Sequence, residues 1–307
     1  MILVVGPSPA FQQRMIFDVI ARDTVNRARE VETLPSGKPI NCARALRRLG
    51  ASARVVLFLG GATGEWIRRG LETEGIPFRG VACAAENRIA CTLFESACGR
   101  TTELVENARA VGAAEAEAFL AAAREELGGA SALLLSGSLP EGFPPSIYRE
   151  LTAEGARRGL PVVVDAQGAA LLAAVEARPT VVKPNRAELA AALGRPLASP
   201  LDREAAMGEI LRRGAANVVV SDGAREVALL QESRSMIFHP PAIQANNAIG
   251  SGDVLAAAIL QALAEGRTME EGVRWGIACA AANAAGPGYA RFDPTRARSL
   301  LRRVTAA

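Results

Sequence analysis

The sequence predicts an α/β fold, a doubly wound, mainly parallel sheet flanked by helices, with a small β-sheet lid. Short apolar runs between turn residues, typical of buried parallel strands, recur at 2–5, 55–59, 132–135, 162–165, 180–183 and 218–221. Segments with helical spacing of apolar residues, several of them ending at glycine, alternate with these runs at 41–50, 114–129, 146–159, 185–194 and 202–214. This alternation indicates helices on both faces of a parallel sheet.

Two polar stretches interrupt the alternation. Residues 11–33 and 76–106 resemble short strands joined by polar turns, inserted between strand–helix units. Together they predict a small second sheet that covers the strand ends as a lid. The chain contains no internal repeat and no long linker, so we expect a single α/β domain over 1–307. Ligands of such folds bind beyond the carboxyl ends of the strands, which is where functional residues are expected.

The composition argues against several classes of function. The formal net charge is +3, basic residues form no long run, and aromatic residues make up only 4%, so we expect no nucleic-acid partner. Apolar stretches are too short to span a bilayer and no basic flank precedes the first one, which predicts a cytoplasmic protein with no membrane partner. Five cysteines without a CxxC pair favour reduced thiols. The single histidine, His239, excludes mechanisms that need paired histidines.

The main chemical signal is GSGD at 250–253, directly before an Ala/Leu-rich helical pattern. Gly250 and Gly252 allow the backbone to approach a ligand closely, and the free N–H groups of a helix start suit a phosphate. Asp253 would then be positioned to accept a proton from a hydroxyl that attacks this phosphate. Taken in isolation, these residues fit a helix-capping aspartate better, although one residue can serve both purposes.

Other basic residues add candidate anion contacts. SGKPIN at 36–41 places Gly37 and Lys38 before a helix expected to begin near Asn41, without a P-loop pattern. Arg27 and Arg88 fall in the two lid stretches, where a pair of guanidinium groups can close over an anion. Each of these charges alone also fits a solvated surface side chain.

KPNRAEL at 183–189 is a candidate magnesium site. A strand ends at Lys183, and Asn185 and Glu188 fall three residues apart on one face of the next helix. Their oxygens can orient Mg²⁺ through water, because this ion keeps several waters and shares itself with substrate phosphates. The alternative is an asparagine-capped helix with a glutamate in its first turn.

These motifs occur in the order of a known family. The chain resembles the PfkB family of ribokinase-like sugar kinases and is most similar to its 1-phosphofructokinase and tagatose-6-phosphate kinase branch. The matching stretches are SPA (8–10), VNRA (25–28), GKPIN (37–41), LRRLGA (46–51), FLGGATG (58–64), NRIACTL (87–93), TTELVE (101–106), LSGSLPEG (135–142), VVKPNRAEL (181–189), VVVSDGA (218–224) and NAIGSGD (247–253). The resemblance implies a ribokinase-like fold and the use of ATP and Mg²⁺.

The resemblance also implies residue roles. Asp253 matches the base that deprotonates the acceptor hydroxyl, and the amides around Gly250, Ser251 and Gly252 match the anion hole for the transferred phosphoryl group. The residues that match the ATP and magnesium side are Lys183, Asn185, Glu188, Ser221, Gly223 and Asn283. Asn185 and Glu188 act on the metal indirectly in this pattern, through water or the ATP phosphates.

On the sugar side, Gly37, Lys38 and Asn41 match the early sugar-binding motif. The residues at positions where this branch holds the phosphate already present on its substrate are Arg27, Arg88 and Ser138. Lid edges often pair between subunits in such folds, which makes a homodimer through the lid an expectation.

The sequence departs from the branch in the sugar motifs. Ser36 and Pro39 replace glycines, and Pro39 removes a backbone donor. Gln12 stands where the branch has an aspartate that holds sugar hydroxyls, and an amide donates as well as accepts. Sites built around a particular hydroxyl discriminate strongly, so these changes bear on which sugar is bound.

We expect ATP-dependent phosphorylation of a hydroxyl of a sugar phosphate, with a ketohexose phosphate as the first candidate. One alternative is a kinase for an unphosphorylated sugar or a nucleoside, which needs no cluster of Arg27, Arg88 and Lys38. An alternative of another class is a non-catalytic sugar-phosphate sensor that kept the fold. A Rossmann dehydrogenase is disfavoured, because GSGD lacks the third small residue of that fingerprint and occurs late in the chain.

Overall fold

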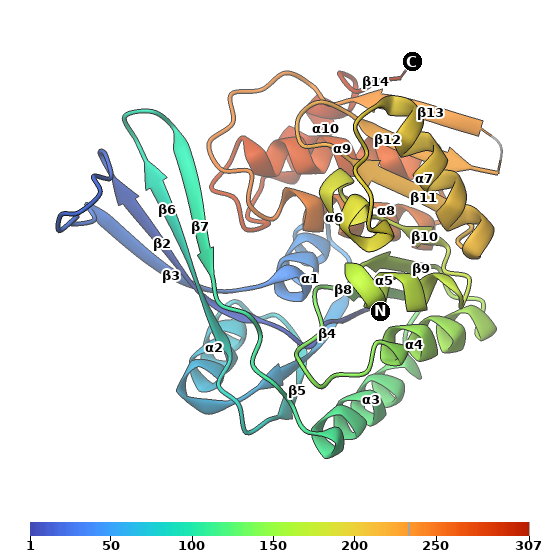
Figure 1. Ribbon diagram of the computed structural model, residues 1–307, viewed down its shortest axis with the longest axis horizontal. Coiled ribbons are helices and arrows are strands. Elements are labelled where there is room, and N and C mark those ends of the chain that lie inside the picture. Colours follow the sequence, from blue (N-terminus) through green and yellow to red (C-terminus); the bar gives the residue numbers. More distant parts are fainter. Residues whose placement is uncertain (233, 307) are drawn as a thin grey trace.

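The computed structural model describes residues 1–232 and 234–306 and contains the expected parallel sheet (Figure 1). The large sheet has the strand order β14-β13-β12-β11-β10-β9-β8-β1-β4-β5. Its parallel strands are β11 (Asn217–Ser221), β10 (Val181–Val182), β9 (Val162–Asp165), β8 (Ala132–Ser136), β1 (Ile2–Val5), β4 (Ala53–Leu59) and β5 (Phe78–Ala82). Each of the six apolar runs of the sequence contains or forms part of one of these strands, so the predicted fold class is confirmed.

An antiparallel extension completes one edge of this sheet. Strand β12 (Val227–Gln231) pairs with β11, β13 (Arg234–His239) pairs with β12, and β14 (Thr305–Ala306) pairs with β13. The sequence reasoning missed these strands. Residues 227–230 form an apolar run as long as that at 2–5, but no helical pattern separates this run from the preceding strand. The alternation of strands and helices therefore does not indicate these strands.

Helices cover both faces of the sheet and create two apolar cores. One core contains α1 (Lys38–Arg48), α2 (Gly61–Thr73), α8 (Ser251–Ala264), α9 (Met269–Ala284) and α10 (Pro294–Leu301). The other contains α3 (Ala113–Leu127), α4 (Ser146–Arg157), α5 (Gly168–Val175), α6 (Arg186–Leu193) and α7 (Pro200–Arg213). In β1, Ile2 and Val4 face the first core while Leu3 and Val5 face the second. A strand covered on both sides is apolar at every position, which explains the unbroken runs in the sequence.

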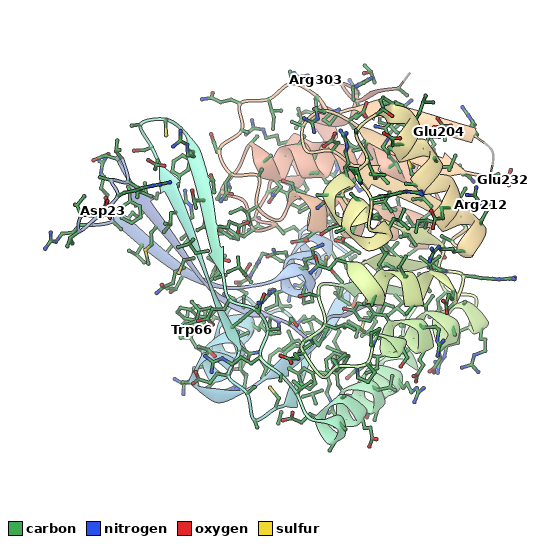
Figure 2. All side chains as sticks on the ribbon, in the orientation of Figure 1. Asp23, Trp66, Glu204, Arg212, Glu232 and Arg303 are labelled. Atoms are coloured by element: carbon green, nitrogen blue, oxygen red, sulfur yellow. The ribbon has the colours of Figure 1, made fainter. Side chains whose placement is uncertain are left out.

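The lid is a separate four-stranded sheet that projects from the main body (Figure 1). Its order is β3 (Glu30–Ser36), β2 (Ala10–Phe17), β6 (Arg88–Glu95) and β7 (Arg100–Val105). Asp23 lies at its far end, and Trp66 lies near its base, where the indole meets the Phe11 ring with centroids 4.5 Å apart (Figure 2). The lid differs from the expected inserts in one respect. Residues 78–82 form β5 of the large sheet, so the second insert starts near Arg88.

Within the described part of the chain, no helix has both the length and the apolar character that a membrane span requires.

Candidate active site

A cavity of about 1100 Å³ lies between the lid and the carboxyl ends of the parallel strands. The lid contributes Gln12 and Arg88, and the start of α1 contributes Gly37, Lys38 and Asn41. The remaining lining residues predicted from the sequence are Lys183, Asn185, Glu188, Ser221, Gly223, Gly250, Ser251, Gly252 and Asp253. The fold therefore brings most of the predicted site residues around one cavity. Arg27, Ser138 and Asn283 are not among the described residues that line it.

Helix α8 begins at the GSGD turn. Gly250 occupies the N-cap position with φ of 80°. Its carbonyl oxygen accepts the first hydrogen bond of the helix, from the Val254 N–H. A Cβ atom at Gly250 would lie 3.2 Å from both the Ala290 nitrogen and the Tyr289 Cα. Both the left-handed backbone and the close approach of residues 289 and 290 therefore favour glycine at this position. The Ser251 N–H donates to the Ala248 carbonyl at 3.0 Å. The N–H groups of Gly252 and Asp253 are the ones that this helix start can offer to an anion.

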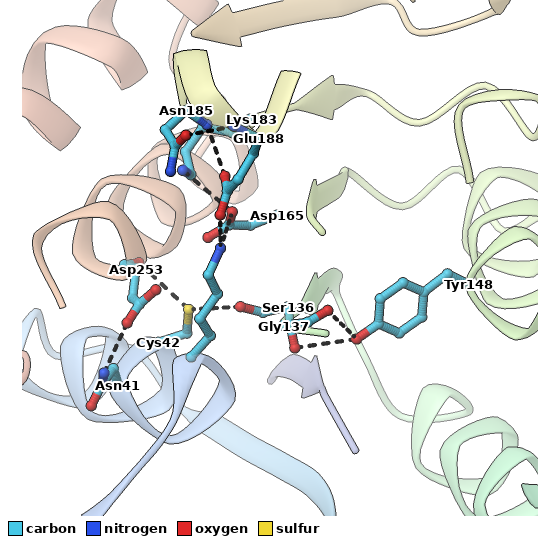
Figure 3. A network of polar contacts seen from close by, with 11 residues as sticks. Asn41, Cys42, Ser136, Gly137, Tyr148, Asp165, Lys183, Asn185, Glu188 and Asp253 are labelled. Carbon is cyan, nitrogen blue, oxygen red and sulfur yellow. Dashed lines mark hydrogen bonds and ion pairs between the residues drawn. The ribbon is translucent and has the colours of Figure 1, made fainter. Parts of the chain in front are cut away.

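Asp253 is not the helix cap that its sequence context favours. Gly250 takes the cap position, no side chain caps this helix, and Asp253 lies in the first turn. Its Oδ2 instead accepts a hydrogen bond of 2.8 Å from Asn41 Nδ2 of α1 (Figure 3). Burial raises the pKa of Asp253 to about 6, although nearby Lys38 opposes this rise. A carboxylate with such a pKa can take up a proton near neutral pH.

Asp165 is a site residue that the sequence reasoning missed. It ends β9, is fully buried, and its Oδ1 lies 3.1 Å from Lys38 Nζ and 3.4 Å from Lys183 Nζ (Figure 3). Burial opposes its ionisation, but the two ammonium groups outweigh burial and hold the pKa of Asp165 below its ordinary value. Two signals were available in the sequence: the apolar run VVVD ends in this carboxylate, and Lys38 and Lys183 are the only lysines of the chain.

Asn185 and Glu188 form a reciprocal capping box at the start of α6. Asn185 Oδ1 accepts from the Glu188 N–H at 2.8 Å, and Glu188 Oε2 accepts from the Asn185 N–H at 2.8 Å. Glu188 Oε1 pairs with Lys38 Nζ at 2.9 Å. The capped-helix alternative is therefore realised, and both oxygens of Glu188 are engaged with protein groups.

Asp165 Oδ2 provides the test of whether the site fits a cation. This oxygen is buried and has no hydrogen-bond partner among the described residues. The described residues contain no cluster of three or more His, Cys, Asp or Glu side chains suited to a metal. Mg²⁺ commonly uses one or two carboxylates together with waters and substrate phosphates. The free oxygen of Asp165, with Glu188 nearby, fits that mode of binding.

The part of the cavity near the end of β11 has both polar and apolar walls. Ser221 and Gly223 lie at the end of β11, where Ser221 forms an isolated bridge with Asn185. The apolar wall, which the sequence reasoning did not anticipate, consists of Val227, Pro241, Ile243, Leu255, Ile277 and Ala281. Such a mixture suits a nucleotide, whose base is flat and largely apolar.

Asn283 supports the GSGD turn from behind. Its side chain is fully buried in α9 and Nδ2 donates to the Ile249 carbonyl at 3.0 Å and to Ser251 Oγ at 2.9 Å. The resemblance places Asn283 on the ATP side, and its contacts hold the turn at which helix α8 begins. This function depends on packing between α8 and α9, which the sequence does not display.

The lid side of the cavity contains one of the two predicted arginines, Arg88. Arg88 donates from Nη2 to the Ser8 carbonyl at 3.3 Å, and its buried Nε has no partner among the described residues. Burial lowers the pKa of Arg88. Ser8 Oγ donates to the Ser138 carbonyl at 2.9 Å, so Arg88 and Ser138 both contact Ser8. Arg27 is exposed in the loop between β2 and β3.

Gln12 is buried, and its side-chain amide nitrogen already donates to protein oxygens. Its Nε2 donates to Thr92 Oγ1 at 3.0 Å and to the Gln13 carbonyl at 3.2 Å. Glu103 of β7 lies opposite Thr92 in the lid and also lines the cavity. The lid thus presents a carboxyl group to the cavity from a strand that the sequence reasoning did not connect with binding.

Comparisons with known proteins agree with this geometry. A model of the pfkB family of carbohydrate kinases matches residues 10–296. Phosphofructokinase-2 from Escherichia coli, in complex with fructose-6-phosphate, is 28% identical over 98% of each chain, with a TM-score of 0.86. A possible 1-phosphofructokinase from Thermotoga maritima is 21% identical over 100% of this chain and 98% of that chain, with a TM-score of 0.90. Arabidopsis thaliana ribokinase, complexed with ribose and ATP, is 21% identical over 98% of each chain, with a TM-score of 0.73.

The chain belongs to the pfkB family of carbohydrate kinases. It is an ATP-dependent sugar kinase, and the family membership expected from its motifs is confirmed.

Proposed function

We propose that this kinase transfers the γ-phosphoryl group of ATP to a hydroxyl of a sugar phosphate, with ketohexose phosphates as the first candidates. The observation that carries this proposal is the position of Asp253, a buried carboxylate on the cavity wall at the start of α8. The similarity to phosphofructokinase-2 supports the choice of sugar phosphates.

The reaction follows from the arrangement of charges. The acceptor hydroxyl attacks the γ-phosphorus in line, its proton passes to Asp253, and the bond between the γ-phosphorus and the bridging oxygen of ADP breaks. The helix N-terminus at Gly250, Ser251 and Gly252 stabilises the charge that develops on the transferred group. Lys38 adds a fixed positive charge at the same end of the cavity.

Asp165 and Glu188 are the residues we propose for Mg²⁺: Asp165 would hold the ion through its free Oδ2, and Glu188, whose two oxygens already contact protein groups, would act through water. The bound ion would neutralise charge on the ATP phosphates. Asn185 keeps Glu188 in place through the capping box, so its role is indirect.

Arg88 supports the choice of a phosphorylated substrate. A partly buried guanidinium with a free N–H on the cavity wall is costly unless an anion approaches it. Arg27 would reach the same phosphate only after lid closure or from the lid of a second copy. Exposed apolar side chains on the lid, namely Val19, Val25, Val31, Leu104 and Val105, support a homodimer through this sheet. Free cysteines are consistent with a cytoplasmic setting.

A coupled ADP-release screen tests the proposal. The acceptors are fructose 1-phosphate, fructose 6-phosphate, tagatose 6-phosphate, fructose, ribose and adenosine, each with ATP and Mg²⁺. We expect turnover with at least one ketohexose phosphate and loss of that turnover in Asp253→Asn. Preference for an uncharged acceptor would favour the alternative kinase. Binding of a sugar phosphate by calorimetry without any ADP formed would favour the sensor. Undiminished ADP release in Asp253→Asn would remove the assignment of the base.

A further inference from the structure

Arg44 is a buried guanidinium one turn beyond Asn41 on α1. It is 4% exposed and lies behind the cavity wall rather than in it. All five of its N–H groups donate to protein oxygens. Nε and Nη2 contact the Glu74 carboxylate at 2.6 and 2.9 Å, and Nη2 also contacts the Pro35 carbonyl at 2.7 Å. Nη1 contacts Asn41 Oδ1 at 3.0 Å and the Tyr289 carbonyl at 2.9 Å.

This contact determines which way the Asn41 amide points. A guanidinium only donates, so the oxygen of the amide must face Arg44 and the nitrogen must face away. Ser36 Oγ, 3.3 Å from Asn41 Oδ1, acts in the same sense. The amide nitrogen is consequently directed at Asp253, where it donates to Oδ2 at 2.8 Å. The reversed amide would place its oxygen against a carboxylate and its NH₂ group against a cation.

The orientation of Asn41 has a consequence for Asp253. The amide holds one carboxylate oxygen, Oδ2, and the other oxygen, Oδ1, accepts no hydrogen bond from the described residues. A base must present a free oxygen to the proton that it takes, at a fixed distance and angle. A carboxylate that could rotate about its terminal torsion would present this oxygen only part of the time.

We propose that Arg44 is a positioning residue: it fixes the Asn41 amide so that Asn41 holds Asp253 Oδ2 and leaves Oδ1 for the acceptor hydroxyl. This inference rests on the proposed function of Asp253 as the base. Arg44 also ties together the end of lid strand β3, at Pro35, and the turn at Tyr289 that packs on Gly250. The same guanidinium therefore connects the lid, the anion turn and the base.

Arg48 offers a matched control on the same helix. Its Nη1 donates to the Phe292 carbonyl at 3.2 Å, so it also joins α1 to the segment after α9, but it has no contact with Asn41. The test compares Arg44→Lys, Arg48→Met, Asn41→Ala and the Asn41→Ala/Arg44→Lys double variant. Lysine keeps a positive charge near Glu74 but cannot reproduce the fork of the guanidinium. For each variant, kcat and the KM for ATP are measured in the ADP-release assay, and folding is checked by thermal unfolding.

We expect Arg44→Lys to lower kcat by about 10- to 100-fold with the KM for ATP unchanged, because misplacement of a reacting group mainly affects the chemical step. Arg48→Met should retain the original kcat. In the Asn41→Ala background, Arg44→Lys should cause no further loss, since the two residues act in series. A kcat of Arg44→Lys within twofold of the original, or losses that multiply in the double variant, would overturn the proposal.

Two more variants keep the test decisive if Arg44→Lys does not fold or if Asp253 is not the base. Asn41→Asp leaves Arg44 intact and still accepts from it, but offers Asp253 no donor, so its kcat should fall at least as far as that of Asn41→Ala. A normal kcat in Asn41→Asp contradicts the proposal even if Arg44→Lys does not fold. Asp253→Asn separates the two levels of inference. If Asp253→Asn is inactive and Arg44→Lys is normal, only the positioning role fails; if Asp253→Asn is active, the assignment of the base fails and the positioning role fails with it.

Discussion

Lys38 and Lys183 contact the same oxygen, Oδ1 of Asp165, at 3.1 and 3.4 Å. The chain has 35 basic residues, and only these two are lysines. Lysine supplies a compact charge with rotatable donors, whereas a guanidinium fork would need more space around one buried carboxylate. The contact between Lys38 and Asp165 also spans 127 residues, from the start of α1 to the end of β9. It joins two segments that line the cavity from distant parts of the chain.

Substitution of the two lysines should have different effects. The Lys183 side chain is 2% exposed and that of Lys38 is 31% exposed. Lys183→Met should destabilise the fold by about 1–3 kcal/mol, because only Lys38 then compensates the fully buried Asp165 carboxylate. Lys38→Met should lower kcat by about 10²-fold while Lys183 still pairs with Asp165, because it removes a charge that faces the substrates. Urea unfolding and ADP release measure the two effects. Equal destabilisation in both variants would contradict this division of roles.

Turnover should depend on pH through Asp253. Burial raises the pKa of this carboxyl to about 6, and a base acts only when it is ionised. We therefore expect kcat/KM for the sugar substrate to be constant above pH 7 and to fall about tenfold per pH unit well below pH 6. The measurement is kcat/KM at saturating ATP between pH 5 and 8. A profile that stays flat to pH 5 would contradict the assignment of Asp253.

Much of the fold could be predicted because the apolar pattern of each buried strand is visible within a short stretch of sequence. Residues 2–5 are apolar at every position because both faces of β1 are covered, and residues 162–164 of β9 show the same pattern. The ends of parallel strands meet at one edge, so residues that follow different strands, such as Lys183 and Ser221, could be expected to share a cavity.

What could not be predicted depends on packing between distant segments. The local sequence around Asp253 fits an N-cap residue. In the structure the N-cap of α8 is Gly250, which has a positive φ, three residues before Asp253. Asn283 faces the GSGD turn because α9 packs on α8, and nothing near residue 283 reveals this. Arg27 lies in the lid as expected, yet the reach of the lid from the main body keeps it outside the cavity of its own chain.

Gly250 offers a sharp test of the anion turn. Gly250→Ala adds a Cβ that would lie 3.2 Å from backbone atoms of residues 289 and 290, at a φ of 80°. Gly266 is a matched control, because it follows the same helix, has φ of 79° and has no atom within 4 Å of an added Cβ. Both alanine variants should lose about 1–2 kcal/mol from left-handed backbone strain. Only Gly250→Ala should also lose most of its ADP release, because its turn must move. If the two variants had equal activity, the turn at Gly250 would have no role in catalysis.

Substitution of Arg88 distinguishes a phosphorylated substrate from an uncharged one. Arg88→Ala removes a guanidinium from the lid side of the cavity, and a hydrogen bond to a charged group contributes about 1.5–3 kcal/mol. The KM for a sugar phosphate should therefore rise by roughly 10- to 100-fold with the KM for ATP unchanged. Arg100→Ala is the control, since Arg100 lies exposed on lid strand β7, 3.9 Å from Glu95, and should leave both KM values as they were. If Arg88→Ala leaves KM unaltered for every accepted substrate, the guanidinium does not bind a phosphate. An uncharged sugar or a nucleoside then becomes the better candidate for the acceptor.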